Sequence, residues 1–280
     1  MQGFVSGIYE YRIKSCGGTS VSRAYLGRGG FLNDRKFMVM DQDNVFLTQR
    51  DLPRMALIRP RLHVLPSVPL HEQGELAVNA PGMSELRVKF SSKDEVGVKE
   101  GRIWDDSCLV VDQGQEAAEW VSRFLETPCK LVRIIHDGRT HHSSTSGEEF
   151  PVYGQDGYPI LIIGQSSLND LNVRMAESIP MYNFRPNIVV SGSPPYAEDT
   201  WKHIRIGSVE IRMVKLCQRC PIPTTNQQTG ERGEDPWQEE PLRTLMTYRQ
   251  VPGGGVIFGV NCINDNAGWI NLGETVEIFS

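Results

Sequence analysis

The sequence lacks long apolar runs, and this absence argues against a helix that spans a membrane. Such a helix needs about 20 consecutive apolar residues, whereas the longest runs here, such as residues 160–163 and 188–190, are far shorter. Residues 1–11 include Glu10 and lack the charged-then-apolar order of a signal peptide. We therefore expect a cytoplasmic protein without a membrane span.

The sequence also lacks an excess of positive charge. It has 29 Lys and Arg residues against 34 Asp and Glu residues, which gives a formal net charge of −5. A nucleic acid polymer as partner is therefore not expected, because such partners are usually met by a basic surface. An anionic small molecule would have to bind a local cluster of basic side chains. The length of 280 residues suits one large domain or two smaller ones.

Several catalytic signatures are absent. The sequence contains no G-x-S-x-G, no H-E-x-x-H and no G-x-x-x-x-G-K-[ST]. Gly27, Gly29 and Gly30 form a G-x-G without the rest of the dinucleotide-binding fingerprint. The adjacent Asp105 and Asp106 could be a pair of catalytic carboxylates, but a turn after a strand is the simpler interpretation.

The pattern of apolar residues predicts a mixed α/β protein dominated by β-strands. Helices are expected where apolar residues share one helical face, at residues 116–125, 166–176 and 241–248. Strands are expected at short, partly alternating apolar stretches: residues 5–13, 37–40, 45–48, 55–58, 130–135, 158–163 and 187–190. Residues 204–216 predict a hairpin with its turn at Gly207 and Ser208, and residues 256–279 predict further strands.

Residues 137–149 are polar and rich in Gly, Ser and Thr. This composition predicts a mobile loop that could be a domain boundary or a lid over a site. His141 and His142 lie in it. We interpret them as solvated loop residues, because a metal site would need further ligands nearby.

Cysteines are few, and two of the six are close together in the sequence. Cys217 and Cys220 form a C-x-x-C at the end of a predicted strand, followed by Pro221. Four interpretations stay open: half of a zinc site, a thioredoxin-like redox pair, two ordinary buried cysteines, and a thiolate ligand for a soft metal beside the cationic Arg219. Zinc would need a second pair of ligands, and a redox pair would normally open a helix.

Basic residues next to small or glycine-rich segments form a second group of candidates. Lys14 and Ser15 precede two glycines, Arg35 follows Asp34, and Arg185 lies in a loop before an apolar strand. Guanidinium and ammonium groups beside closely approaching backbone N–H groups can bind a phosphate. Taken singly, each of these residues is more often a solvated surface charge.

A set of strings in fixed order resembles the MOSC family, named for the C-terminal domain of molybdenum cofactor sulfurase. Within this family the chain is most similar to the mitochondrial amidoxime-reducing component and to bacterial hydroxylaminopurine-resistance reductases. The strings are I-K-S-C at 13–16, N-D-R at 33–35, T-Q-R-D-L-P-R at 48–54, D-G-Y-P at 156–159, S-L-N-D-L-N at 167–172, F-R-P-N-I-V-V-S-G at 184–192, Y-A-E-D at 196–199, I-R-I-G at 204–207, C-Q-R-C at 217–220, T-T at 224–225 and E-P-L-R-T-L-M-T-Y-R at 240–249.

The resemblance implies a MOSC β-barrel core at residues 131–280 and an N-terminal β-barrel-like domain at residues 1–130. It further implies a molybdenum–molybdopterin cofactor whose metal is held by Cys220, which would also be the catalytic residue. The implied cofactor-binding residues are Lys14, Ser15, Arg35, Asp156, Gly157, Tyr158, Arg185, Asn187, Gln218, Arg219 and Asn261. Pyridoxal phosphate binding is implied only at the level of the whole family.

The resemblance also implies an oxidoreductase that reduces N-hydroxylated compounds, such as amidoximes and hydroxylamino bases, by oxo transfer. No C-x₄-C-x₂-C run is present. We therefore expect a separate electron donor: a flavin reductase, a cytochrome b5-like protein or a ferredoxin-like protein. The alternatives are a carrier of the molybdenum cofactor, a sulfur-relay module with a persulfide, and a structural or zinc-binding β protein.

Overall fold

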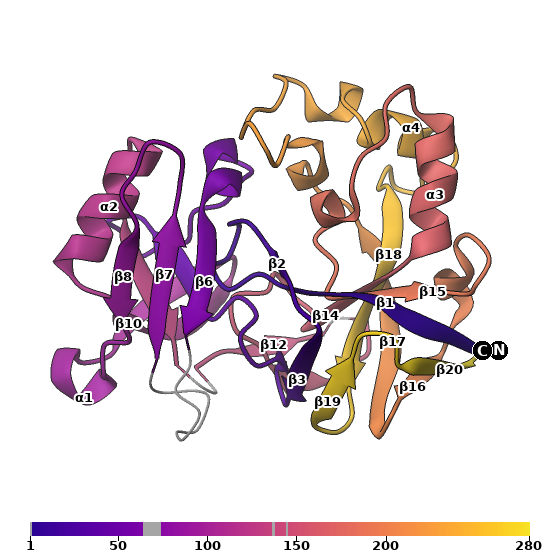
Figure 1. The fold of residues 1–280 in the computed structure, drawn as a ribbon, viewed down its shortest axis with the longest axis horizontal. Helices are drawn as coiled ribbons and strands as arrows, with labels where there is room; N and C mark the ends of the chain where they lie inside the picture. The colour runs from indigo at the N-terminus through magenta and orange to yellow at the C-terminus, as the bar shows by residue number, and fades with distance from the viewer. Residues whose placement is uncertain (1, 64–73, 136–137, 144) are drawn as a thin grey trace.

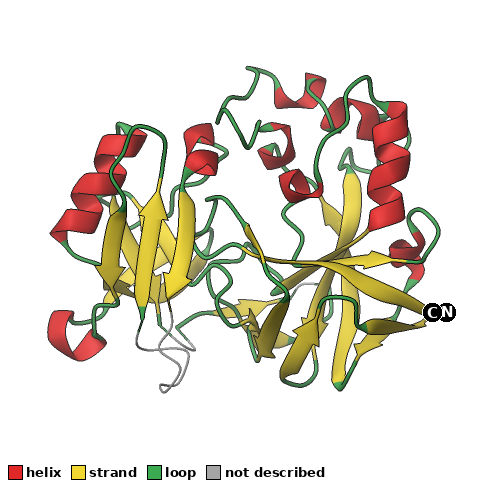
Figure 2. Cartoon of the chain, in the orientation of Figure 1, coloured by secondary structure: helices red, strands yellow, loops and turns green. Residues whose placement is uncertain are grey.

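The computed structural model describes residues 2–63, 74–135, 138–143 and 145–280. The chain forms two halves, one mainly purple to magenta in Figure 1 and the other mainly pink to yellow, and the indigo strand β1 lies in the second half. Strands make up 39% of it and helices 18%. The helices lie at the outer edges of the strands (Figure 2). The predicted fold class, mixed and dominated by β-strands, is confirmed.

Six strands of the C-terminal half and the first strand of the chain, β1, form a closed barrel of seven strands. The strand order is β15-β14-β18-β17-β16-β20-β1, and β1 pairs with β15 to close the ring. Only the pairing of β14 with β15 is parallel among these strands. They are β1 (Gln2–Glu10), β14 (Ile160–Gly164), β15 (Ile188–Ser191), β16 (His203–Ile206), β17 (Val209–Gln218), β18 (Ile257–Asn264) and β20 (Thr275–Phe279). The short β2 (Thr19–Ser20) pairs with the end of β1.

Every second side chain of the barrel strands points inward, and these apolar side chains fill the barrel. Ile204 and Ile206 of β16 are fully buried, as are Val209 and Ile211 of β17. The residues between them are polar and at least partly exposed, since successive side chains of a strand point to opposite faces. The predicted hairpin at residues 204–216 is confirmed by the antiparallel pairing of these two strands.

The N-terminal half is built from two smaller sheets. The four-stranded sheet has the order β5 (Phe37–Met40), β11 (Lys130–Ile134), β10 (Asp106–Asp112) and β9 (Lys99–Ile103). The three-stranded sheet has the order β6 (Arg59–His63), β7 (Glu75–Asn79) and β8 (Leu86–Lys89). The helix α2 (Gln115–Leu125) buries its apolar face against this half, as predicted.

The remaining elements are short. The helices are α1 (Lys93–Val96), α3 (Gln165–Arg174) and α4 (Leu242–Met246), with 3₁₀ turns η1 (Pro53–Leu57), η2 (Met181–Phe184), η3 (Ala197–Thr200), η4 (Ile222–Thr224) and η5 (Pro236–Gln238). A three-stranded sheet contains β19 (Gly268–Asn271), β3 (Arg23–Gly27) and β4 (Gly30–Phe31). The hairpin of β12 (Thr140–His142) and β13 (Glu149–Pro151) completes the structure.

Three predictions of local structure are wrong. At the expected strand of residues 45–48 the structure has only isolated β-bridges, of Phe46 with Met40 and of Val45 with Arg102. The expected strand at residues 55–58 is instead the 3₁₀ turn η1, because Pro53 at its start supplies a helical φ and has no N–H to lose. The expected loop at residues 137–149 contains the β12–β13 hairpin, in which His141 pairs with Phe150. Residues 137 and 144 of that segment lie outside the described residues.

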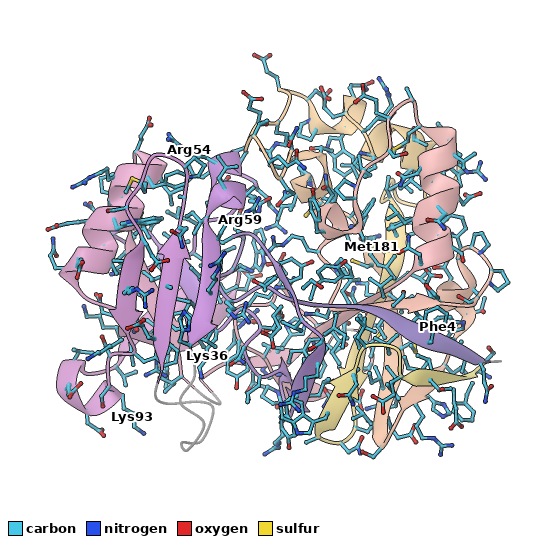
Figure 3. All side chains as sticks on the ribbon, in the orientation of Figure 1. Phe4, Lys36, Arg54, Arg59, Lys93 and Met181 are labelled. Carbon is cyan, nitrogen blue, oxygen red and sulfur yellow. The ribbon has the colours of Figure 1, made fainter. Side chains whose placement is uncertain are left out.

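Strands on each side of the predicted boundary at residues 130 and 131 pair with strands of the other side. β1 belongs to the barrel although it begins the chain, and β11 pairs with β5 and β10 of the N-terminal half. Figure 3 shows Arg59 on the side of the N-terminal half that faces the C-terminal half, where its guanidinium donates to the carbonyl of Gln227. The division at residues 130 and 131 stays a prediction.

Candidate functional site

A cavity of about 320 Å³ is lined by residues from both halves of the chain. The N-terminal half contributes the segment after β1 and two loops on either side of β5. The C-terminal half contributes the loop before β14, the segment after η2 and the end of β17. Chain segments far apart in the sequence therefore meet at one place, as expected of a ligand site between two structural units.

The charge of this cavity is opposite to the net charge of the protein. Its described lining residues include six basic side chains and a single acidic one, Asp156. The basic residues are Lys14, Arg35, Arg50, Arg185, Lys215 and Arg219. A concave site lined mostly by cations in an acidic protein is suited to an anionic ligand, since the local field attracts what the whole molecule repels.

Lys14, Arg50 and Asp156 form an ion-pair network at one wall. Lys14 Nζ donates to the carbonyl oxygen of Gly154 at 2.8 Å and also to the Asp156 carboxylate. Arg50 Nη2 donates to the other oxygen of that carboxylate at 2.6 Å. Burial lowers the pKa of Lys14 to about 8, against the opposing charge of Asp156. Burial would raise the pKa of Asp156, but the charges of Lys14 and Arg50 outweigh it and hold that pKa well below its usual range.

Arg139 holds the loop that carries Asp156. Its side chain is buried, and it donates to the carbonyl oxygens of Tyr153 at 3.1 Å, of Gln155, and of Asp156 at 3.1 Å. It also donates twice to the carboxylate of Asp106, at 2.6 and 3.0 Å. Asp106 thus follows a turn, as predicted, and its carboxylate orients the arginine that shapes the site.

The loop is also closely packed at two of its glycines, and at Gly154 too closely to admit another residue. A Cβ on Gly154 would lie 2.7 Å from the carbonyl oxygen of Arg35. At Gly157, a Cβ would lie 3.2 Å from Nε2 of His141. His141 therefore packs against the site, with its side chain 22% exposed, whereas His142 is 69% exposed. The prediction of a solvated residue is wrong for His141, because the β12–β13 hairpin folds it against the loop.

At a second wall of the cavity, the side chains of two arginines stack on one aromatic ring. The guanidinium carbons of Arg35 and Arg185 lie 4.4 and 4.2 Å from the ring centroid of Tyr11, which is completely buried. Arg185 Nη1 donates to the carbonyl oxygen of Cys16 at 2.6 Å. Burial, together with the charge of Arg35, lowers the pKa of Arg185 to about 10. Both arginines are thus held in place before any ligand arrives.

Three lining residues adopt backbone conformations that disfavour L-amino acids. The φ angles of Ser15, Arg35 and Arg185 are +62°, +49° and +59°. Each such conformation costs on the order of 1 kcal/mol and persists only where surrounding structure enforces it. Their concentration in one cavity indicates that side-chain placement at this site outweighs backbone preference.

The two cysteines of the C-x-x-C lie at the end of β17 and just beyond it. Arg219 Nη1 lies 3.3 Å from Sγ of Cys217, and its Nη2 donates to the carbonyl oxygen of Phe184 at 2.7 Å. Burial raises the pKa of the Cys217 thiol, against the charge of Arg219. Cys220 instead lies near Arg50, and the charges of the two groups interact. Each thiol therefore has its own guanidinium partner.

All twelve residues named from the sequence line this cavity. They are Lys14, Ser15, Arg35, Asp156, Gly157, Tyr158, Arg185, Asn187, Gln218, Arg219, Cys220 and Asn261. What they bind stays a prediction. Sequence reasoning did not assign a further nine lining residues to the site: Arg50, Gly154, Gln155, Leu161, Phe184, Lys215, Leu216, Cys217 and Ile222. The string T-Q-R-D-L-P-R could have indicated Arg50, and the alternation of β17 could have indicated Lys215.

Three buried arginine nitrogens at the cavity lack hydrogen-bond partners. They are Nη1 of Arg50, Nη2 of Arg185 and Nε of Arg219. A buried donor without an acceptor is unfavourable by about 1–3 kcal/mol, so an anionic ligand that supplied acceptors would gain binding energy here.

Within the described part of the chain, no three His, Cys, Asp or Glu side chains are grouped to hold a metal. A metal at Cys220 would therefore need ligands from a non-protein group.

Comparison with known proteins identifies the family. The MOSC N-terminal beta barrel domain matches residues 2–128, and the MOSC domain matches residues 149–277. This chain belongs to the MOSC family. The N-terminal MOSC match includes β1, which structurally completes the barrel of the other half.

Similar proteins extend over nearly the whole MOSC chain. Mitochondrial amidoxime reducing component 2 from Bos taurus is 32% identical over 98% of this chain and 82% of the relative. The protein of the same name from Homo sapiens is 36% identical over 88% of this chain and 72% of its own length. Mitochondrial amidoxime-reducing component 1 from Homo sapiens is 32% identical over 99% of this chain and 83% of its own length. Among the described helices of this MOSC protein, none combines the length and hydrophobicity required to cross a bilayer.

Proposed function

We propose that this protein is a molybdenum cofactor-dependent reductase of N-hydroxylated compounds. The observation that carries the proposal is a strongly cationic cavity that holds the thiol of Cys220, in a chain similar to proteins named for reducing amidoximes. The cations suit the phosphate of a pterin cofactor, and a thiolate suits molybdenum. The unpartnered nitrogens of Arg185 and Arg219 support an anionic occupant.

Each half of the cavity would hold a different part of the cofactor. Lys14, Arg35 and Arg185 would bind the phosphate. Lys14 and Arg185 are buried, Arg35 is partly buried, and both arginines are held against the ring of Tyr11. Cys220 would hold the metal. The remaining contacts to the pterin would come from Ser15, Asp156, Gly157, Tyr158, Asn187, Gln218, Arg219 and Asn261. The bound cofactor would supply the two-electron chemistry that removes oxygen from an N–O bond by oxo transfer.

The protein's own side chains would orient the cofactor and separate its charges from water. Asp156 fixes the ammonium group of Lys14, and Arg139 fixes the loop that carries Asp156. Asn187 accepts from the backbone N–H of Leu161 at 3.1 Å and from Arg35 at 3.4 Å, so it joins β14 to the phosphate-binding wall. Hydrogen bonds of this kind, between the ligand-binding residues and their neighbours, limit the movement of the residues that touch the ligand.

Electrons would come from a separate donor: a flavin reductase, a cytochrome b5-like protein or a ferredoxin-like protein. The cytoplasmic location, pyridoxal phosphate binding and the identity of the physiological substrate stay predictions. The substrate would be a small molecule, because the cavity has a volume of only about 320 Å³ and shares it with the cofactor.

A cofactor carrier or sulfur-relay module is the second candidate function. It is favoured by one observation: Cys217 lines the same cavity as Cys220 and lies beside Arg219. A thiol next to a guanidinium could hold a persulfide, because the cation stabilises the sulfur anion. In that case a persulfide should be detectable on the protein without metal.

The experiment compares two single substitutions in protein purified from a host that makes the cofactor. Molybdenum content and the reduction of benzamidoxime with an artificial electron donor are measured for the native protein, Cys220→Ser and Cys217→Ser. The reductase proposal expects molybdenum and activity in the native protein, and the loss of activity only in Cys220→Ser. A native protein that is loaded with molybdenum but reduces no N-hydroxylated compound would contradict it.

A further inference from the structure

Trp104 connects the N-terminal half to the rim of the cavity. Its indole Nε1 donates to the Asp156 carboxylate at 3.2 Å, and the guanidinium carbon of Arg50 lies 4.9 Å from its ring. Phe46 contacts the indole at a ring-centroid distance of 4.9 Å in a T-shaped arrangement. Both Asp156 and Arg50 line the cavity. Even so, 47% of the Trp104 surface is exposed.

The backbone at Trp104 is poorly suited to a tryptophan. Trp104 and Asp105 form the two-residue turn between β9 and β10, since Ile103 pairs with Asp106. Of these two residues only Trp104 has a positive φ, at +53°. Glycine is the residue favoured at such a turn position. A bulky aromatic residue kept in this conformation points to a role of the side chain rather than of the turn.

We propose that Trp104 is a specificity-determining residue that stacks against planar, aromatic N-hydroxylated substrates at the mouth of the cavity. The proposal rests on the proposed function and narrows its substrate class. The indole is anchored at its N–H edge by Asp156 and packed by Arg50 and Phe46, so it loses little freedom when a substrate arrives. An exposed, pre-positioned aromatic ring beside a polar cavity favours ligands with a flat apolar group.

A purely structural role is the competing explanation. Trp104 could act only as a tie between Asp156, Arg50 and the N-terminal half. Its loss would then disturb the cavity for every ligand alike. A role in stacking instead predicts a loss confined to aromatic ligands, because aliphatic ligands gain nothing from the indole face. The two roles are therefore separated by comparing ligands rather than by activity alone.

The first measurement is the calorimetric binding of benzamidine and acetamidine, the amidines expected as products, to the cofactor-loaded protein. We expect Trp104→Ala to weaken benzamidine binding roughly three- to tenfold, in line with typical aromatic pair energies, and to leave acetamidine binding unchanged. Trp104→Phe should retain most of the affinity for benzamidine. An equal loss for both amidines, or no loss for benzamidine, would overturn the proposal.

Trp269 of β19 offers a matched control. It is 46% exposed and has the guanidinium carbon of Arg23 at 4.9 Å, so its surroundings resemble those of Trp104. Trp104 contacts the lining residues Asp156 and Arg50, whereas the ring contacts of Trp269 are with Tyr25 and Arg23, which do not line the cavity. Trp269→Ala should leave the binding of both amidines unchanged. A loss of benzamidine binding in Trp269→Ala equal to that in Trp104→Ala would overturn the proposal.

The second measurement is steady-state reduction of benzamidoxime and acetamidoxime. Trp104→Ala should raise KM for benzamidoxime by the factor seen in binding, with kcat and the kinetics of acetamidoxime unchanged. A KM ratio between the two substrates that does not change would overturn the proposal. If the native, molybdenum-loaded protein reduces neither substrate, the proposed function fails. The amidine measurements still decide the role of Trp104.

Discussion

At the scale of single residues, the cavity depends on cations that are charged despite burial. Lys14 is only 4% exposed, and burial brings its pKa from the ordinary value of 10.5 to about 8. Because the pKa is lowered, Lys14 is charged at pH 7 and loses its charge as the pH rises through 8. Anion binding at this wall should weaken over the same range.

This dependence is tested with sulfate, whose charge is constant between pH 7 and pH 9. Sulfate should bind the cofactor-free protein up to about tenfold more weakly at pH 9, because about a tenth of Lys14 remains charged there and a hydrogen bond to a charged group contributes about 1.5–3 kcal/mol. In Lys14→Met the affinity at pH 7 should already be reduced and should change little with pH. Binding measured by calorimetry that falls equally in both proteins would contradict the assignment to Lys14.

The strained turn at Trp104 gives a second prediction for a single residue. Trp104→Gly and Trp104→Ala both remove the contacts to Asp156 and Arg50, so they differ mainly in backbone preference. With φ at +53°, the glycine variant should be more stable than the alanine variant by about 1 kcal/mol. Urea unfolding of the two variants measures the difference. Equal stability would show that the turn relaxes to another conformation.

At the scale of elements, β18 contacts β14 more closely than ordinary strands permit. Gly259 of β18 has a φ of +80°, and a Cβ there would lie 2.6 Å from Cγ1 of Ile163 and 2.9 Å from the carbonyl oxygen of Ile162. The neighbouring pairing of β17 with β18 also shifts register twice. Glycine at this position lets β18 bend in the barrel wall that carries Asn261 into the cavity.

Gly259→Ala should therefore destabilise the protein by about 2–4 kcal/mol. This sum contains the cost of a positive φ for alanine and the cost of overpacking by its methyl group. Gly273→Ala is the control, because Gly273 has a φ of +82° but nothing within 4 Å of its hypothetical Cβ. The free energy of unfolding of Gly273→Ala should fall by only about 1–2 kcal/mol, the cost of a positive φ for alanine. The free energies of unfolding come from urea denaturation. Equal losses would mean that the close approach to Ile163 adds nothing.

At the scale of the whole molecule, the two halves depend on each other. β1 lies between β15 and β20 and closes the barrel. Elsewhere the buried amides of Gln49 and Gln227 pair, with Gln227 Nε2 donating to Gln49 Oε1 at 2.9 Å. Gln49 Nε2 also donates to the carbonyl oxygen of Ser15 at 2.6 Å, which ties this contact to the cavity.

A fragment of residues 131–280 tests this dependence. Without β1, the facing edges of β15 and β20 would be unpaired and the barrel would be open, so the fragment should aggregate or remain unfolded. Fusing residues 2–10 to its C-terminus through a flexible linker should restore folding, because Gln2 pairs with Glu277 near the chain end. Circular dichroism and size-exclusion chromatography distinguish the states. A monomeric, folded fragment without β1 would contradict the prediction.

The sequence by itself determined several of the regular elements and indicated the family. Alternating apolar residues predicted the β16–β17 hairpin, and a stripe of five apolar residues predicted α2. These features are local, since periodicity is written along the chain. The ordered strings also named twelve residues that all line one cavity. No physical argument from spacing could select Cys220 over Cys217, and that choice still rests on the resemblance.

Only the tertiary structure decided how these residues meet. Arg50, Trp104 and Arg139 lie far from Asp156 in sequence, yet all three contact it or its backbone. No local pattern marks such contacts, because they arise from the pairing of sheets and the closing of the barrel by β1. The positive charge of the cavity could not be predicted for the same reason. The net charge of the chain is negative, yet six basic residues from distant segments line the cavity with one carboxylate among its described lining residues.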